Sequence, residues 1–231
     1  MKTLGIIGGV GPESTIDYYR SIIALYRQRT GDGSYPEIII NSIELKTEIE
    51  LVERNQFAAL TTYLLREIER LAHAGADFGL IASNTPHLVF SELRPRSAIP
   101  LISIVEATCD SARRMKLKCV GLFGARFTMQ GSFYPDVFSR ADIRVVTPEL
   151  PDQAYVRNKY MNELVNGVFL PETRDGLLKI AARLIESQRI EGLILGGTEL
   201  PLILKEDTYN GLPILNTTKI HVEAAVTEML A

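Results

Sequence analysis

Short, continuous apolar runs alternate with longer amphipathic segments along this chain. Apolar residues at positions 57, 60, 64, 68 and 71 recur at helical spacing and predict a helix that ends near Gly75. The continuous runs are expected to be strands at residues 3–7, 37–41, 78–82, 101–104, 119–123, 143–146, 193–195 and 214–215. Strands without polar alternation, separated by helices, predict an α/β fold with parallel sheets covered by helices on both faces.

The pattern repeats within the chain at an offset of about 110 residues. Four pairs of segments match: KTLGIIGG (2–9) with KCVGLFGA (118–125), PEIIIN (36–41) with IRVVTP (143–148), DFGLIASNTPH (77–87) with EGLILGGTELP (191–201), and IPLISIVEAT (99–108) with LPILNTTKIH (212–221). A consistent offset predicts two similar α/β halves, with a small-ligand site between them. The alternative is one doubly wound sheet without internal symmetry.

Composition narrows the class of protein. The 231 residues are 46% hydrophobic and 23% charged with a net charge of −3, which is typical of a soluble globular protein and gives no basic field for nucleic acid. No apolar run approaches the roughly 20 residues that span a bilayer, and the N-terminal segment reads as a strand and not as a signal peptide. Cys109 and Cys119 form neither a disulfide framework nor a metal-ligand spacing. We expect a cytoplasmic protein without a metal.

The first loop, GGVGPEST, invites comparison with dinucleotide-binding loops because Gly9 and Gly11 lie between a strand and a helix. The comparison is poor, since the third glycine position is Ser14 and Pro12 lacks an N–H for a phosphate. A carboxylate at this helix N-terminus is the better expectation. Ser14 or Thr15 is the expected helix cap.

Polar side chains follow the two matching strands near residues 82 and 196. The first set is Ser83, Asn84 and Thr85, and the second, after Gly197, is Thr198 and Glu199. Hydroxyl, amide and carboxylate groups at strand ends suit a small, polar, carboxylate-bearing substrate. The alternative is that Asn84, Thr85 and Thr198 cap the helices that follow.

Three histidines complete the candidate chemistry. His73 lies late in a predicted helix and is expected at the surface, whereas His87 and His221 follow strand ends. His87 is a candidate for direct proton transfer, and the alternative is a structural role. No nucleophile elbow and no clustered Cys/His metal set is present.

Four stretches carry a resemblance to a known family: KTLGIIGGVGPESTIDYY, ADFGLIASNTPH, LFGARFTM and ILGGTELPLIL. In order and over the whole length, they resemble the aspartate/glutamate racemase family of the Asp/Glu/hydantoin racemase superfamily. The resemblance implies two pseudo-symmetric α/β lobes with the active site between them, no cofactor, and a homodimer. It places the first lobe at residues 1–98 plus 208–231 and the second at 99–207.

Racemases of this kind remove an α-proton on one face of an amino acid and return one on the other. The family typically uses two cysteines, in Cys-Asn-Thr and Gly-Cys-Thr-Glu motifs, because a thiol with a pKa near 8.5 is partly ionised at neutral pH. Here the two positions are Ser83 and Gly197. By resemblance, the substrate-binding positions are Gly9, Val10, Lys46, Asn84, Thr85, Thr128, Asn166 and Thr198.

The resemblance therefore implies a cofactor-independent racemase for aspartate or glutamate, and the two replacements imply impaired activity. A serine hydroxyl needs an adjacent base. Glycine has no side chain, so proton abstraction on that face would fall to Glu199, His221 or water. The alternative is a non-catalytic paralogue that binds dicarboxylates. Decarboxylation is a third, weaker alternative, because the related decarboxylases keep one cysteine.

Overall fold

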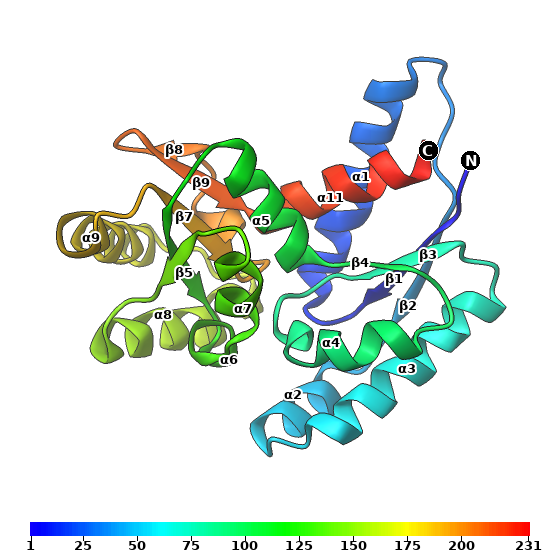
Figure 1. Ribbon diagram of the computed structural model, residues 1–231, viewed down its shortest axis with the longest axis horizontal. Coiled ribbons are helices and arrows are strands. Elements are labelled where there is room, and N and C mark those ends of the chain that lie inside the picture. The colour runs from blue at the N-terminus through cyan, green and yellow to red at the C-terminus, as the bar shows by residue number, and fades with distance from the viewer. The chain divides into compact units, whose positions relative to one another are not determined.

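The computed structural model describes residues 1–231, which divide into two compact units. The first unit is Met1–Ile104 with His221–Ala231, and the second is Val105–Ile220. Each unit holds a sheet of mainly parallel strands flanked by helices, so the predicted α/β class is confirmed (Figure 1). None of the helices combines the length and the apolar character that crossing a membrane requires.

The sheet of the first unit has the strand order β2-β1-β3-β4, with every neighbouring pair parallel. Its elements are β1 (Leu4–Gly8), α1 (Pro12–Thr30), β2 (Ile38–Ser42), α2 (Leu45–Glu53), α3 (Phe57–His73), β3 (Phe78–Ile81), the 3₁₀ turn η1 (Thr85–Val89), α4 (Phe90–Leu93), η2 (Arg94–Arg96), β4 (Leu101–Ile102) and most of α11 (Thr217–Met229).

Helices cover both faces of this first sheet. On one face, Leu4 and Ile6 of β1 share a buried cluster with Tyr18 of α1 and Val226 of α11. On the other face, α3 approaches so closely that a methyl group at Gly5 would lie 3.1 Å from the Leu71 side chain. Figure 1 shows α1 and α11 on one side of β1, with α2 and α3 on the other.

The sheet of the second unit has the order β6-β5-β7-β9-β8, and only β8 is antiparallel to its neighbour. Its elements are α5 (Ile104–Arg114), β5 (Cys119–Gly124), α6 (Arg126–Gln130), α7 (Phe133–Ser139), β6 (Arg144–Val146), α8 (Leu150–Asn162), η3 (Leu164–Asn166), α9 (Pro171–Gln188), β7 (Gly192–Gly196), α10 (Leu200–Ile203), β8 (Thr208–Tyr209) and β9 (Leu212–Asn216). Side chains of α8, α9, β5 and β7 form its main buried cluster.

The internal repeat is confirmed by the strand order and the register. The order β2-β1-β3-β4 of the first sheet recurs as β6-β5-β7-β9 in the second. Leu4 pairs with Phe78, and Val120, its counterpart in the repeat, pairs with Gly192. Counting five residues onward from each partner makes Ser83 the counterpart of Gly197 (78 + 5 and 192 + 5). A single sheet without symmetry is therefore excluded.

The unit boundaries differ from the expected lobes, which placed residues 208–231 with the first lobe and 99–207 with the second. β9 hydrogen-bonds to β7, so the chain stays with the second unit until Ile220. β4 pairs with β3, so residues 99–104 lie with the first unit. The helices after β4 and β9 are thus exchanged: α5 continues into the second unit, while α11 joins the core of the first.

Candidate functional site

Each unit carries a group of candidate site residues, all but Tyr160 predicted from the sequence, where one of its inner strands ends. We call Ser83, Asn84 and His87 the β3-end cluster, and Gly197, Thr198, Glu199 and Tyr160 the β7-end cluster. The carboxyl ends of parallel strands are where ligands bind in α/β sheets. That both clusters line one cleft stays a prediction, and the chemistry of each is described separately.

The loop after β1 is built on tight backbone contacts. Gly9 has φ 83° and lies against the backbone of Ile43, so only glycine fits there. The expected caps were wrong: α1 begins at Pro12 with Gly11 as its N-cap and no side-chain cap bond. Thr15 Oγ1 instead accepts the Gly9 N–H at 2.8 Å, so this N–H is not available to an anion.

Ser14 and Val10 anchor this loop to the interior. The Ser14 hydroxyl donates to the carbonyl oxygen of Ala82 at 3.1 Å, which ties α1 to the end of β3. Val10 is 5% exposed and belongs to the core. The loop is therefore held in one conformation beside the β3-end cluster.

The β3-end cluster is almost enclosed. Ser83 is 8% exposed and Asn84 3%, and the Ser83 N–H donates to Ile81 at 2.8 Å. Asn84 occupies the N-cap of η1, but its side chain makes no capping bond, so the capping alternative was wrong for this residue. Thr85 is the first residue of η1.

His87 is a buried, neutral imidazole. Its Nε2 accepts the Ile104 N–H at 3.3 Å, and its ring stacks on Phe90 at 4.7 Å between centroids. Burial, followed by the neighbouring His221, lowers the pKa of His87 to about 3. Its Nδ1 has no hydrogen-bond partner. An imidazole in this environment is a weak base at neutral pH.

His221 is satisfied within the first unit. The Tyr18 hydroxyl lies 2.8 Å from Nδ1, and Nε2 lies 3.1 Å from the carbonyl oxygen of Ile102. These partners fix a tautomer in which Nδ1 accepts and Nε2 donates. Burial lowers the pKa of His221 to about 4. Both ring nitrogens serve the packing of α11 against the first unit.

Gly197 at the β7 end faces an aromatic ring. A Cβ at this position would lie 2.5 Å from Cε2 and 3.1 Å from the hydroxyl oxygen of Tyr160. Tyr160 comes from α8 and is 9% exposed. Its ring therefore fills the space into which a side chain at residue 197 would project.

Tyr160 is hydrogen-bonded to a buried carboxylate. Its hydroxyl donates to Glu199 Oε2 in a short contact, and the Thr198 hydroxyl donates to the same oxygen at 3.1 Å. Burial, then the charge of Glu199, raises the pKa of Tyr160 well above its usual value. The phenol is therefore protonated, and Glu199 is its acceptor. Thr198 bonds to this carboxylate and caps no helix, because α10 has no side-chain cap bond.

Three further predicted binding residues lie on other elements. Lys46 is exposed and lies 4.0 Å from Glu50 in an i,i+4 ion pair. Asn166 is exposed, and its amide donates to the carbonyl oxygens of Met161 and Asn162 near the end of α8. Thr128 is buried on α6.

The cysteines and His73 lie where the sequence indicated. Cys109 and Cys119 are both buried and free. His73 is exposed at the end of α3.

Two buried polar residues were missed from the sequence. Tyr160 gave no local signal, because its partner Glu199 is 39 residues away. Glu48 did give one: it shares a helical stripe with Leu45, Ile49 and Val52, where an apolar residue is expected. Glu48 is 3% exposed, and its Oε1 has no partner.

Replacing Glu48 with glutamine is expected to stabilise the protein above pH 7. Burial raises the pKa of Glu48 to about 7, so the folded protein holds a proton that the unfolded chain releases near its usual value of 4.5. Stability is therefore lost as the pH rises through this window, by up to about 3 kcal/mol. Urea unfolding at pH 5 and pH 8 should show Glu48→Gln gaining on the parent only at pH 8.

Glu53→Gln, on the exposed face of the same helix, is the matched control for that measurement. It removes a carboxylate without changing a buried one. Equal pH dependence in the parent and in Glu48→Gln would contradict the assignment.

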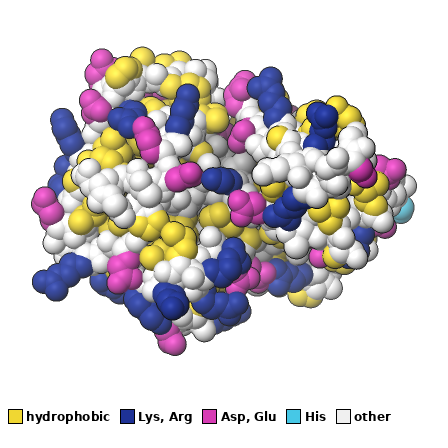
Figure 2. All heavy atoms as spheres, turned by 90° about the horizontal axis from the view of Figure 1, so that it is seen from above, with side chains coloured by type: hydrophobic (Ala, Val, Ile, Leu, Met, Phe, Trp, Pro, Cys, Tyr) yellow, Lys and Arg dark blue, Asp and Glu magenta, His cyan; other side chains and the backbone are white.

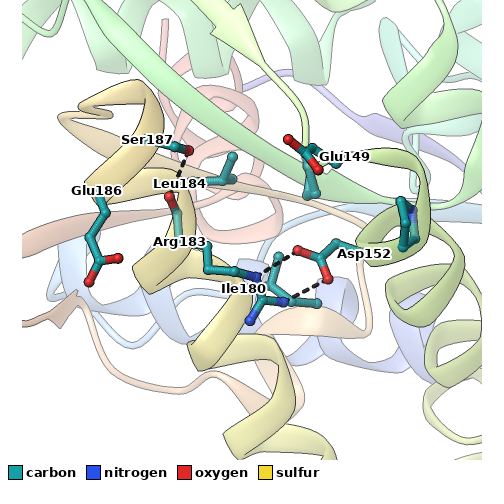
Figure 3. A pocket seen from close by; sticks show the side chains of 9 residues that line it. Glu149, Asp152, Ile180, Arg183, Leu184, Glu186 and Ser187 are labelled. Atoms are coloured by element: carbon teal, nitrogen blue, oxygen red, sulfur yellow. Dashed lines mark hydrogen bonds and ion pairs between the residues drawn. The ribbon is translucent and has the colours of Figure 1, made fainter.

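An open groove lies elsewhere on the second unit, between the start of α8 and α9 (Figure 3). Its cation is already paired, since Arg183 donates from Nε and a terminal nitrogen to the two oxygens of Asp152, at 2.9 and 2.6 Å. Glu149 and Glu186 add negative charge to its lining. The groove is therefore unsuited to a dicarboxylate.

The distribution of surface charge does not indicate another ligand-binding site. On the face drawn in Figure 2, Lys and Arg side chains are interspersed with Asp and Glu side chains. Ion pairs such as Arg174–Glu206 at 2.6 Å and Lys219–Asp207 at 3.1 Å follow the same mixture. Exposed pairs of this kind contribute little to stability.

Comparison with known proteins gives a consistent result. The profile of the family described as Asp/Glu/Hydantoin racemase matches residues 7–225. A crystal structure of a proposed Asp/Glu racemase from Yersinia pestis has 30% identity and a TM-score of 0.89, and all of both chains is covered. An aspartate racemase homologue from Pyrococcus horikoshii has 30% identity and a TM-score of 0.85, again with complete coverage. Glutamate racemase from Aquifex aeolicus is 24% identical over 64% of this chain and 57% of its own length.

Proposed function

We propose a function from the premise that this chain belongs to the Asp/Glu/hydantoin racemase family. The protein is a cofactor-independent amino-acid racemase of the aspartate/glutamate type, and its substrate is a small dicarboxylic amino acid. Its turnover is slow, because Ser83 and Gly197 stand at the positions where the family carries its two cysteines.

The observation that supports this proposal most is the equivalence of two strand ends. Register makes Ser83 the counterpart of Gly197, one in each unit, and both follow central parallel strands. Two-sided proton exchange at one carbon needs such a pair of positions. The polar residues that follow, Asn84 and Thr198, are buried and suit the recognition of a small polar ligand.

A second candidate function is dicarboxylate binding without catalysis. It is favoured because Gly197 has no acid/base group of its own, and because the Tyr160 ring occupies the space beside it. A serine hydroxyl is also a poor proton acceptor unless a base is adjacent. The two candidates share a ligand class and differ in whether the α-proton leaves.

Solvent-deuterium exchange at the α-carbon separates these functions. With aspartate or glutamate in deuterium oxide, we expect calorimetric binding together with slow incorporation of deuterium, followed by NMR. Binding without exchange would favour the non-catalytic candidate. No heat and no thermal shift with either amino acid would contradict the proposed substrate class, and rapid racemisation would contradict the impairment.

The homodimer implied by the resemblance and the cytoplasmic location expected from the sequence remain predictions. Sedimentation of the purified protein tests the dimer. The absence of a required cofactor is tested in the same exchange assay, by comparing activity before and after exhaustive dialysis against a chelator.

A further inference from the structure

A phenol and a carboxylate are paired at the β7 end, next to the glycine that takes the place of an acid/base residue. Glu199 is 2% exposed, and its Oε2 accepts both the Tyr160 and the Thr198 hydroxyl groups. Burying a carboxylate costs free energy unless hydrogen bonds stabilise its charge. The two hydroxyl groups provide such bonds to Glu199.

The phenol oxygen lies beside the position that a side chain at residue 197 would take. It is 3.1 Å from the point where a Cβ on Gly197 would sit. We infer that Tyr160, backed by Glu199, is the proton-transfer group of the second unit. This inference rests on the proposed function.

The pair can take and return one proton without any further reactant. The substrate α-carbon–hydrogen bond breaks, its electron pair stays on the carbon, and the proton passes to the Tyr160 oxygen. At the same time the original phenol proton moves to the Glu199 carboxylate. The result is a neutral phenol, a neutral carboxylic acid and a substrate carbanion. The reverse transfer restores the substrate on the same face, and it delivers deuterium to the carbon once the proton on the Tyr160 oxygen has exchanged with solvent.

The β3-end cluster offers no matching pair. Ser83 carries a hydroxyl, a far weaker acid than a thiol, and the Nε2 lone pair of His87 already accepts the Ile104 N–H. Proton exchange is therefore expected to be faster on the face that Tyr160 serves than on the opposite face. Deuterium should enter one enantiomer of the substrate with retention of configuration, faster than the enantiomers interconvert.

The test compares Tyr160→Phe, Glu199→Gln and a matched control in the exchange assay. Both variants should lower the turnover number for exchange by about 100-fold, the lower range for general acid–base catalysis, with little change in KM. Tyr155→Phe removes a phenol from the same helix and should stay within about twofold of the parent. Glu199→Gln keeps an acceptor for the phenol but cannot take up its proton, so it tests the relay if Tyr160→Phe folds poorly.

Each outcome decides one claim. Exchange at the parent rate in a folded Tyr160→Phe, or in Glu199→Gln, overturns this inference and leaves the proposed function standing. Inversion that is as fast as exchange in the parent overturns the preference for one face. A parent that binds aspartate and glutamate without exchange overturns the relay together with proton chemistry, and a parent that binds neither overturns the proposed function itself.

Discussion

Acidification from pH 6.5 to 4.5 is expected to lower the free energy of unfolding by about 3 kcal/mol. The folded pKa values of His87 and His221, about 3 and about 4, lie below those of the unfolded chain. The unfolded chain therefore binds protons that the folded one excludes. Stability is complete above the unfolded value near 6.5 and is lost as the pH falls toward the folded values.

The magnitude follows from opposing contributions. Two pH units correspond to about 2.7 kcal/mol for each histidine, or about 5 kcal/mol for the two. Glu48 acts in the opposite direction over the same window, because its folded pKa of about 7 is raised, and it offsets about half of that loss. Glu48→Gln should therefore increase the acid-induced loss to about 5 kcal/mol.

Urea unfolding at the two pH values provides the measurement. His87→Gln should remove about half of the histidine contribution, although it also costs packing against Phe90 at every pH. His73→Gln, which replaces the exposed histidine of α3, is the control and should leave the pH dependence unchanged. If His73→Gln changed the slope and His87→Gln did not, the burial argument would be wrong.

Gly197→Cys alone is expected to destabilise the protein and to restore little racemisation. Its Cβ would lie 2.5 Å from the Tyr160 ring, so the ring must move and break its bond to Glu199. Overpacking of this kind costs about 1–3 kcal/mol. Adding Tyr160→Ala makes room for the thiol, and further adding Ser83→Cys should give racemisation at least about 100-fold faster than the parent.

Gly197→Ala separates packing from chemistry in that series. It introduces the same clash without a thiol, so its loss of stability should match that of Gly197→Cys. Thermal unfolding gives the stability, and polarimetry gives the rate of racemisation. If Gly197→Cys were as stable as the parent and racemised its substrate rapidly, the prediction would be wrong. The Tyr160 ring would then be able to move away from residue 197 without a loss of stability.

The repeated architecture was predictable because each strand can be recognised from the residues of its own short segment. Strands buried on both faces need continuous apolar runs, and the four matching segments fixed the register as well as the order. The predicted match of residue 101 with 214 recurs in the sheets, where Leu101 pairs with Gly79 and Ile214 with Leu193, the counterpart of Gly79. The strand-end positions Ser83 and Gly197 followed from the same alignment.

The lobe boundaries and the buried polar pairs were not predictable, because they depend on long-range packing. An amphipathic helix shows that it has an apolar face, but not which sheet that face will cover. The resemblance had placed α5 with the second lobe and α11 with the first, but the helical pattern does not show that β4 pairs with β3 and β9 with β7. Likewise, the sequence of α8 does not show which of its side chains packs beside Gly197, a position that Tyr160 takes.

The exchanged helices also determine the order in which the two units can fold during translation. The core that encloses Leu4 and Tyr18 includes Val222 and Met229, which the ribosome adds more than 200 residues after Leu4. The second unit, Val105–Ile220, is contiguous and can fold as soon as it emerges. The half that is synthesised first must therefore wait for the half that follows, and a nascent chain halted before α11 would expose an apolar sheet face for chaperones to shield.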